Sequence, residues 1–359
     1  MERFYVDPDI SLAKTLDKSF YHEPSNFELS KEKIFDRCWL YASDITSLDQ
    51  HQAYPFELLP GFLNESLLLT KKSGKINCLS NVCTHRGSLI LDKPCSINEL
   101  RCPYHGRRFD LEGNIISMPE FKEVKNFPST SDNLANLKLY NWHGLGFVNI
   151  EGFHTADVFF KEMNERVKWM PLDKMQYKAE LSRDYAVKSH WALYCENYLE
   201  GFHIPFVHAG LNKEIDYGNY TTELFENASL QIGYAKNNES VFDIPAGAFY
   251  HGKAVAGLYF FIFPNMMFNF YPWGLSLNIV KPVSIDTCLI SFRTYVWDES
   301  KLNKGAGAGL HEVEMEDEAV VEGVQKGLKS RYYQHGRYSV NREQGTHHFH
   351  RLICKFMNA

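Results

Sequence analysis

The sequence has no apolar stretch as long as the roughly 20 residues that a membrane-spanning helix needs. Its first residues, MERFYVDPDISLAK, also lack the apolar core of a secretory signal peptide. Cysteine is sparse: 8 cysteines are spread over 359 residues, which argues against a disulfide framework and for buried thiols. These absences predict a cytosolic protein that does not bind membranes.

Clustered positive charge is missing as well. The chain has 38 Lys and Arg against 44 Asp and Glu, its formal net charge is −6, and its basic residues form no run. We therefore expect no nucleic-acid binding. There is no G-x-G-x-x-G dinucleotide fingerprint and no plant-type C-x₄-C-x₂-C set, so the chain is not expected to take electrons from NAD(P)H by itself. The GAGAG run at 305–309 lacks the fingerprint spacing and is interpreted as a flexible linker.

What is present is the composition of an ordinary globular protein, with 44% hydrophobic and 23% charged residues. The length favours two domains, and the predicted fold class is α+β. Short β-type runs separated by turn residues predict a small all-β domain at 39–152, without a helix of ordinary length. An N-terminal segment at 1–38 is expected to pack on the second domain, 153–359.

The second domain mixes helical and strand patterns. Two aromatic-rich segments, 258–273 and 275–297, predict strands of a curved antiparallel sheet around a cavity, a helix-grip (START-like) arrangement. Residues 191–202 predict a helix that ends before Pro205, and residues 312–330 predict a second helix. In the N-terminal segment that precedes the first domain, Ser30 is predicted to cap a short helix.

Two short motifs each pair one cysteine with one histidine. They are Cys83-Thr84-His85 and Cys102-Pro103-Tyr104-His105, and each is followed by a glycine that suits a tight turn. Two thiolates can hold one iron of a [2Fe–2S] cluster while two imidazoles hold the other, which is the ligand set of a Rieske centre. The rivals are unrelated buried cysteines and a Cys₂His₂ zinc site, whose C-x₂₋₄-C and H-x₃₋₅-H halves these motifs do not match.

In these residues the chain resembles the Rieske family. Rieske proteins of respiratory complexes carry an additional cysteine in each loop, and this chain has Ser88 and Tyr104 at those positions. The resemblance therefore implies the oxygenase or ferredoxin branch of the family, with a lower cluster potential. It implies Cys83, His85 and their counterparts in the second motif as cluster ligands.

A second constellation lies in the segment ENYLEGFHIPFVH at 196–208. His203 and His208 offer two neutral nitrogens, and one carboxylate from elsewhere would complete the facial triad of an O₂-activating Fe(II) site. H-x₄-H alone is a weak signal, because most histidines are structural. The whole string resembles the catalytic motif of Rieske non-haem iron oxygenase α subunits. That resemblance implies functional roles for Asn197 and Glu200.

On this resemblance Glu200 is the acid that bridges His203 and a cluster histidine of a neighbouring subunit. Second-shell carboxylates also fix the orientation of metal-binding histidines. Most family members have Asp here, and Glu implies the branch that oxidises choline, carnitine and related quaternary amines. The C-terminal segment from 324 to 356 also resembles the end of such chains, and its histidines are interpreted as packing residues: His347, His348 and His350.

The third iron ligand is predicted from the later helix. The pair Glu316-Asp317 matches the acidic pair of the family, and Asp317 is the predicted ligand. A neighbouring glutamate remains an alternative, because acidic residues crowd this stretch and such a run is usually a solvated face: Glu312, Glu314 and Glu318.

The resemblance implies a terminal oxygenase with a [2Fe–2S] cluster and mononuclear Fe(II), which uses O₂ and a separate NAD(P)H-dependent reductase, with or without a ferredoxin. Electron transfer between subunits implies a head-to-tail homotrimer. The expected reaction is hydroxylation or oxidative demethylation of a small quaternary or N-methylated amine. Aromatic rings of the strand segments can bind such a cation: Tyr259, Phe260, Phe261, Phe263, Phe268, Phe270, Tyr271 and Trp273. Aromatic-ring dihydroxylation and a non-catalytic electron carrier are the alternatives.

Overall fold

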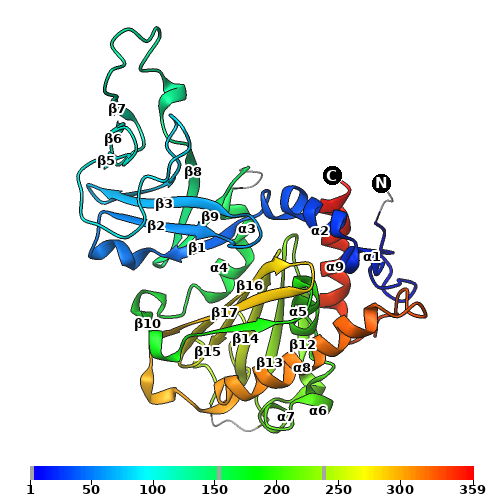
Figure 1. Cartoon of the computed structure of the whole chain (residues 1–359). Helices are drawn as coiled ribbons and strands as arrows, with labels where there is room; N and C mark the ends of the chain where they lie inside the picture. The colour runs from blue at the N-terminus through cyan, green and yellow to red at the C-terminus, as the bar shows by residue number, and fades with distance from the viewer. Residues whose placement is uncertain (1–3, 152–154, 237–239) are drawn as a thin grey trace. The chain divides into compact units, whose positions relative to one another are not determined.

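The structure is a computed structural model that describes residues 4–151, 155–236 and 240–359. The chain divides into two compact units (Figure 1). One unit joins residues 1–35 to residues 154–359, and the other consists of residues 36–153. The N-terminal segment is therefore part of the same unit as the second half of the chain.

The smaller unit is built from antiparallel strands. Its main sheet has the order β1-β9-β8-β4-β3-β2, with these bounds: β1 Leu40–Asp44, β2 Ala53–Leu58, β3 Glu65–Lys72, β4 Lys75–Ser80, β8 Asn136–Trp142 and β9 Leu145–Asn149. A second sheet has three short strands: β5 Leu100–Arg101, β6 Arg108–Phe109 and β7 Ile115–Ser117. Among the described residues of this unit, the helical segments are two 3₁₀ turns, Ile45–Asp49 and Thr130–Asp132. The expected small β fold is confirmed.

One apolar core joins the two sheets of the smaller unit. Leu68 of β3, Leu79 of β4 and Phe109 of β6 are each fully buried in it. Cys83 and Cys102 belong to the same core, and each is only 2% exposed. The backbone of both cysteine motifs is therefore anchored in packed, apolar surroundings, while the residues that follow each cysteine rise toward solvent.

The larger unit contains an eight-stranded antiparallel sheet in the order β10-β17-β16-β15-β14-β13-β12, with β11 also paired to β17. Its strands are β10 Gln176–Tyr177, β11 Arg183–Val187, β12 Thr221–Leu224, β13 Ala228–Tyr234, β14 Val255–Ile262, β15 Met266–Tyr271, β16 Gly274–Ser284 and β17 Thr287–Val296. The two aromatic-rich segments form the four central strands. The expected α+β class, with a curved antiparallel sheet, is confirmed.

Aromatic side chains of the central strands alternate between the two faces of this sheet. Phe260 of β14 lies directly opposite Phe268 of β15, and Phe268 stacks on Phe270. Tyr259 and Tyr271 lie on the other face, with their ring centroids 5.8 Å apart. Because side chains along a strand alternate with a period of two, about half of the predicted aromatic set faces away from the cavity.

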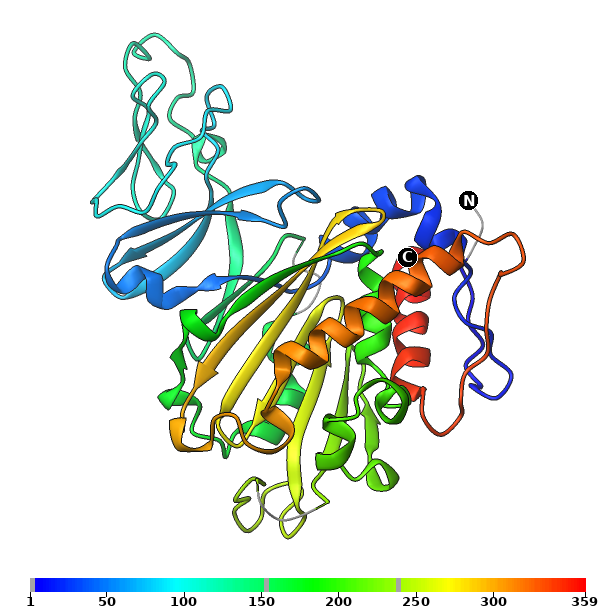
Figure 2. The ribbon, with the colours of Figure 1, turned by 60° about the horizontal axis from the view of Figure 1, so that its bottom comes forward.

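Three longer helices lie against one face of the sheet (Figures 1 and 2): α5 Trp191–Tyr198, α8 Leu310–Leu328 and α9 Gln344–Met357. The shorter helices are α1 Ser19–His22, α2 Pro24–Ser30, a π-helical turn Lys31–Phe35, α3 Ala156–Phe159, α4 Lys161–Val167, α6 Ile204–Val207 and α7 Leu211–Glu214. The remaining helical segments are 3₁₀ turns: Leu172–Lys174, Ala179–Leu181, Tyr217–Asn219, Glu299–Lys301 and Gly305–Gly307. None of the helices in the described ranges is both long enough and apolar enough to cross a bilayer.

Two details of the predicted helices differ in the structure. α5 begins at Trp191 and ends before Pro205 as predicted, but its last residue is Tyr198 rather than residue 202. Pro205 lies in the first turn of α6, where a missing backbone N–H costs nothing. Ser30 does not begin a helix. It is the last residue of α2, and its hydroxyl donates a hydrogen bond back to the Phe27 carbonyl.

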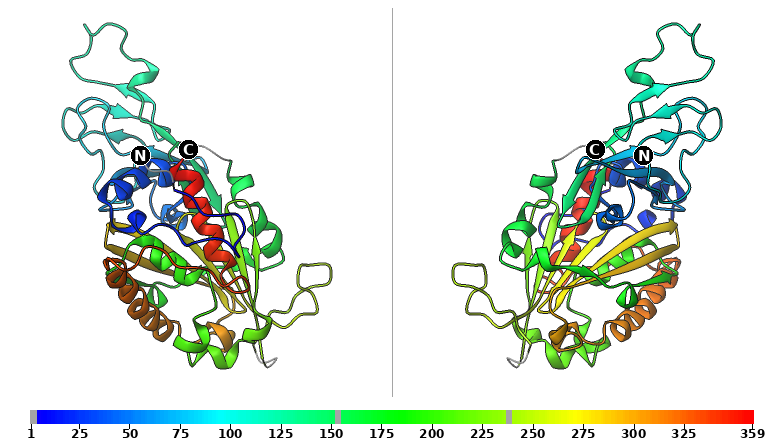
Figure 3. Two further views of the ribbon diagram at one scale, coloured as in Figure 1. Left: turned by 90° about the vertical axis from the view of Figure 1, so that its right-hand side faces the viewer. Right: turned by 90° about the vertical axis from the view of Figure 1, so that its left-hand side faces the viewer.

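The two ends of the larger unit lie side by side (Figure 3). The Asn358 side chain, next to the end of α9, accepts from the Phe4 backbone N–H and donates to the Phe4 carbonyl. Within the same network the His347 ring bonds the Asp7 carbonyl over 2.7 Å. The N-terminal segment is thus fastened along α9.

Candidate metal centres and the adjoining cavity

The two cysteine-histidine loops have the same backbone design. In the first loop the Gly87 N–H donates to the Cys83 carbonyl over 3.0 Å. In the second loop the Gly106 N–H donates to the Cys102 carbonyl, also over 3.0 Å. Both glycines have positive φ angles, +71° and +74°, which an L side chain rarely adopts. Each glycine therefore closes the turn that aims the preceding histidine.

The loops bring the four predicted cluster ligands together. The rings of His85 and His105 lie 4.8 Å apart, centroid to centroid, and are nearly perpendicular. The thiols of Cys83 and Cys102 are both buried and lie within hydrogen-bonding range of each other. The Nδ1 atom of His105 is buried and has no hydrogen-bond partner among the described residues. A buried polar atom without a partner is costly, so it suits an atom that binds metal.

Asp132 connects the two loops and was not foreseen from the sequence. Its carboxylate pairs with the guanidinium of Arg107 at 2.5 Å, and its backbone carbonyl accepts from the Thr84 hydroxyl over 2.7 Å. Arg107 follows the second motif and is only 2% exposed, whereas Thr84 lies within the first motif. Asp132 lies outside both motifs, so no local pattern could reveal this link.

The three residues predicted to bind the mononuclear iron lie close together in the structure. Nε2 of His203 lies 3.1 Å from Nε2 of His208, which in turn lies 3.0 Å from Oδ1 of Asp317. Nε2 of His203 is 3.5 Å from the same oxygen. The two histidines flank α6, and Asp317 comes from α8, 109 residues after His208. This is the one group of three or more His, Cys, Asp or Glu in the described chain whose ligand atoms all lie within 4.8 Å.

Each histidine is held from behind by a carboxylate. Oε1 of Glu200 lies 2.7 Å from Nδ1 of His203, and Oε2 of Glu316 lies 2.6 Å from Nδ1 of His208. Burial opposes protonation of His208, but the hydrogen bonds that its ring donates to Asp317 and Glu316 raise its pKa above the usual value. Such carboxylates fix the ring orientation and leave Nε2 toward the metal position. The role of Glu316 behind His208 was not foreseen.

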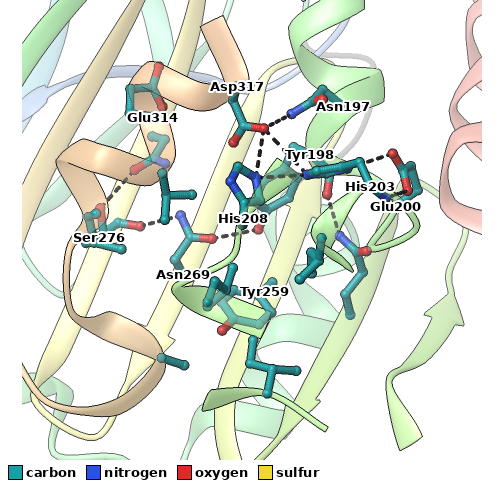
Figure 4. A pocket seen from close by; sticks show the side chains of 18 of the residues that line it. Asn197, Tyr198, Glu200, His203, His208, Tyr259, Asn269, Ser276, Glu314 and Asp317 are labelled. Carbon is teal, nitrogen blue, oxygen red and sulfur yellow. Dashed lines mark hydrogen bonds and ion pairs between the residues drawn. The ribbon is translucent and has the colours of Figure 1, made fainter. Parts of the chain in front are cut away.

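Asn197 and Glu200 take distinct positions around this set (Figure 4). The Asn197 amide, at the end of α5, donates to Oδ1 of Asp317 over 2.6 Å. The second carboxylate oxygen of Glu200 accepts the backbone N–H groups of Phe202 and His203. Asn197 therefore orients the carboxylate of α8, and Glu200 stiffens the turn that carries His203.

Helical spacing explains which acidic residues of α8 face inward. Leu310, Val313 and Asp317 line the cavity, and Val321 one turn later is buried. Glu314 shares this face, whereas Glu312 and Glu316 are exposed. Leu310, Val313, Glu314 and Asp317 occupy positions i, i+3, i+4 and i+7 of one helix face. This spacing could have indicated from the sequence that Asp317 faces inward, which the charge of the segment alone does not indicate.

A cavity of about 120 Å³ opens beside the mononuclear set. Its lining includes five tyrosines, from α5, from the segment before β12 and from the sheet: Tyr194, Tyr198, Tyr220, Tyr259 and Tyr271. Figure 4 shows Tyr259 on the far side of His208 from Asp317. Glycines make room for these rings: a Cβ on Gly201 would meet the Tyr220 ring at 2.8 Å, and one on Gly307 would meet Tyr271 at 3.0 Å.

The GAGAG run is more ordered than the expected flexible linker. It forms the 3₁₀ turn Gly305–Gly307 and ends at Gly309, which has φ +63° and caps α8. Ala306 is buried and lines the cavity. The run thus closes one wall of the cavity.

The C-terminal histidines are not part of the mononuclear set. The His350 ring bonds the hydroxyls of Tyr21 and Tyr338 and pairs with Glu196. Because Glu196 precedes Asn197 on α5, this buried network fastens α5 to α9 and to the N-terminal segment.

Comparison with known protein families places both halves of the chain. The family described as the ring hydroxylating alpha subunit (catalytic domain) matches residues 172–359, and the Rieske [2Fe-2S] domain matches residues 39–128. The chain belongs to the ring-hydroxylating α-subunit family. It is therefore a Rieske oxygenase, an oxidoreductase that holds a [2Fe–2S] cluster and mononuclear iron. The alternative of a non-catalytic electron carrier does not account for the catalytic-domain match.

Characterised members of this family resemble the chain over its length. Choline monooxygenase from Arabidopsis thaliana is 28% identical over 97% of this chain and 84% of the relative. The carnitine monooxygenase oxygenase subunit of Escherichia coli K12 is 28% identical over 99% of this chain and 96% of the relative. A crystal structure of the quaternary ammonium Rieske monooxygenase CntA, in complex with an inhibitor, covers 97% of this chain and 96% of its own, with a TM-score of 0.79 and 24% identity. That likeness shows the shared fold.

Proposed function

We propose that this Rieske oxygenase hydroxylates or oxidatively demethylates a small quaternary or N-methylated amine. The observation that carries the proposal is the convergence of His203, His208 and Asp317 at the wall of a cavity lined by five tyrosines. The faces of tyrosine rings attract a quaternary ammonium through cation–π interactions. Choline and carnitine appear in the names of relatives that match nearly the whole chain, which supports the same substrate class here.

The donor sets suit the two iron groups. We propose Cys83, His85, Cys102 and His105 as ligands of the cluster, two thiolates and two imidazoles in loops of matching design. We propose the second set, two imidazoles and one carboxylate on one side of a cavity, as the facial triad of the mononuclear iron. When bound, this iron supplies the activation of O₂. Residues 39–152 would then form the cluster domain, and 153–359 with 1–38 the catalytic domain.

Several residues around the iron position orient the proposed iron ligands. Glu200 and Glu316 hold Nδ1 of the two histidines, which directs each Nε2 at the metal position. Asn197 holds Asp317 through Oδ1. The tyrosines and Ala306 surround the substrate and exclude water from it. We further propose that Glu200 links His203 to a cluster histidine of a neighbouring subunit.

The proposed assembly is a head-to-tail homotrimer served by a separate NAD(P)H-dependent reductase, directly or through a ferredoxin. Phe202 and Phe206 beside Glu200 are 40% and 80% exposed, and Leu89 and Tyr104 beside the cluster loops are 51% and 57% exposed. Exposed apolar side chains next to both centres suit a contact with a second copy of the chain. Two different surfaces in contact generate a ring. A cytosolic location stays a prediction, since the plant relatives are named chloroplastic.

The decisive experiment reduces the iron-loaded protein anaerobically, exposes it to O₂ with single candidate substrates, and identifies the products. The panel contains N-methylated amines and aromatic acids. We expect a hydroxylated or demethylated amine product in one turnover. Oxidation of aromatic acids alone, with a cis-dihydrodiol product, would replace the proposal by aromatic-ring dihydroxylation.

A further inference from the structure

Three carboxyl side chains line the cavity: Glu200, Asp317 and Glu314. Glu200 and Asp317 are engaged with the histidines, but Glu314 is not. Glu314 is 3% exposed, and one of its oxygens accepts from the Tyr194 hydroxyl. The other oxygen, Oε1, is buried without a hydrogen-bond partner in the described part of the chain. The wall of the cavity therefore holds a carboxyl group with one unpaired oxygen and with no Lys or Arg partner in the described lining.

The charge balance of the cavity favours a cationic occupant. Among the described residues that line it, none is Lys or Arg. Burial and the neighbouring Asp317 raise the pKa of the Glu314 carboxyl to about 8, so a cation beside it would favour loss of its proton. A ligand carboxylate beside Glu314 would find no Lys or Arg in the described lining to pair with, and burying such an unpaired charge is strongly unfavourable.

Neutral polar groups cross the inner face of the sheet as a row. Gln231 of β13 lies opposite Tyr259, Tyr259 opposite Asn269, and Asn269 opposite Ser276. Asn269 is fully engaged, because it accepts from the Tyr198 hydroxyl and donates to the Ser276 carbonyl. Ser276 donates to Asn278, which also lines the cavity.

Gln231 is the residue of this row whose side-chain oxygen accepts no hydrogen bond from the described residues. Its amide nitrogen donates to the Tyr198 carbonyl over 2.6 Å. Its Oε1 is buried and has no partner among the described residues, although Gln231 lines the cavity. An unpaired buried acceptor of this kind matches a hydroxyl or N–H group of a ligand. It is a poor match for a carboxylate, which can only accept.

One arginine lines a neighbouring pocket. Arg183 lines a second hollow that shares Ser276, Phe292 and Leu310 with the cavity. Its guanidinium donates to the backbone carbonyls of Glu180 and Ser182. A longer zwitterion that extended into this hollow would meet Arg183, so this arginine offers a test.

We propose that the cavity selects an ammonium cation with a hydroxyl or another neutral donor group, and rejects cations that also carry a carboxylate. This inference rests on the proposed function and narrows it: the preferred substrate is an amino alcohol of the choline type rather than an amino acid of the carnitine type.

The test compares matched ligands on the iron-loaded enzyme, by calorimetric binding and by substrate-dependent O₂ uptake with product analysis. Choline is compared with glycine betaine, in which a carboxylate replaces the CH₂OH group, and with its uncharged dimethylbutanol isostere, in which carbon replaces nitrogen. We expect choline to bind roughly ten-fold or more tightly than either. Equal or tighter binding of glycine betaine or carnitine would overturn the inference, and so would equal binding of the uncharged isostere.

Variants locate the effect within the cavity. Gln231→Leu should weaken choline binding about ten-fold, because the hydroxyl loses its acceptor, yet leave ethyltrimethylammonium unchanged. The matched control is Ser229→Ala on the same strand, which removes a buried hydroxyl outside the cavity lining. Arg183→Gln should leave choline binding unchanged. Equal losses for both ligands in Gln231→Leu, or a loss of choline binding in Arg183→Gln, would contradict the assignment.

The two proposals fail in different ways. If zwitterionic amines are oxidised as well as choline, the charge selection is wrong while amine oxidation stands. If no ammonium compound is oxidised and an aromatic acid is, the proposed function itself is wrong.

Discussion

The two candidate iron centres are built in opposite ways. The cluster loops repeat one local design, in which a glycine with positive φ closes a turn onto a buried cysteine, first at Cys83 and again at Cys102. The mononuclear set has no such repeat. His203 and His208 flank one short helix, but Asp317 and its partner Asn197 come from α8 and α5, which meet through tertiary packing.

The difference teaches where each centre is vulnerable. A loop whose donors are close in sequence depends on its own backbone and on a few anchors such as Asp132. A set assembled from separate helices depends on every contact that fixes those helices, including the Glu196–His350 pair that holds α5. Changes in one centre should therefore leave the other centre intact.

The largest effect is expected from Cys83→Ser. Loss of a thiolate ligand should abolish the visible and EPR signals of the cluster and stop turnover, while mononuclear iron stays bound. Iron analysis with EPR spectroscopy checks both outcomes. The control is Cys95→Ser, a half-buried cysteine away from the loops, which should keep the full signal. A persistent Rieske spectrum in Cys83→Ser would remove this assignment.

Asp317→Ala should have the opposite effect to Cys83→Ser on the two iron centres. The variant should lose mononuclear iron and activity but retain the cluster spectrum, because the ligand comes from α8 and not from the loops. Metal analysis of the purified protein measures the loss. Glu312→Ala, an exposed position on the same helix, is the matched control. Full iron content in Asp317→Ala would direct attention to a neighbouring glutamate.

Asp132→Ala tests the anchor between the loops. The buried guanidinium of Arg107 would lose its partner, which should cost about 3 kcal/mol of stability in the smaller unit. Thermal unfolding and the rate of cluster loss should both report it, while Asp132→Asn should retain part of the effect by keeping a hydrogen bond. An unchanged cluster lifetime in Asp132→Ala would show that the loops hold each other without this link.

Glu316→Gln tests the unforeseen partner of His208. A glutamine can still accept from Nδ1 but carries no charge, so iron affinity should fall by roughly 10-fold to 100-fold, with the cluster unaffected. Titration of the iron-depleted protein with Fe(II) measures this change. If the Fe(II) affinity of Glu316→Gln equals that of the unaltered protein, Glu316 has no role in iron binding.

The smallest effect is expected on the stability of the fold, from His190 at the N-terminal end of α5. Burial lowers the pKa of His190 to about 3, whereas the unfolded chain has a value near 6.5. Below pH 6.5 the unfolded state therefore binds a proton that the folded state does not, and stability falls, by roughly 1.4 kcal/mol at pH 5.5. The variant His190→Asn keeps an acceptor for the Ala192 N–H, and its free energy of unfolding, measured with denaturant, should depend less on pH than that of the unaltered protein. The same pH dependence in both proteins would contradict this prediction.

Most of the fold class was predictable because strand and helix periods are local. The aromatic-rich segments gave the central strands, and the acidic segment gave α8. The errors fell at element ends. The helix before Pro205 was predicted to reach residue 202 but ends at Tyr198, and Pro205 itself lies in the first turn of the next helix, because proline is well tolerated at that position. Ser30 was expected to cap a helix, but α2 passes at Ser30 directly into the π-helical turn Lys31–Phe35, and the Ser30 hydroxyl bonds a preceding carbonyl.

The sequence by itself determined the chemistry: two Cys-His loops, an H-x₄-H pair and a later acidic pair, each readable because its residues are neighbours in the chain. Tertiary structure decided what depends on distance. It directed Asp317 inward and Glu316 behind His208, joined the loops through Asp132, and placed Glu314 and Gln231 in the same cavity. Linear patterns record neighbours within a few residues, whereas the packing of helices on a sheet decides which remote side chains share a buried space.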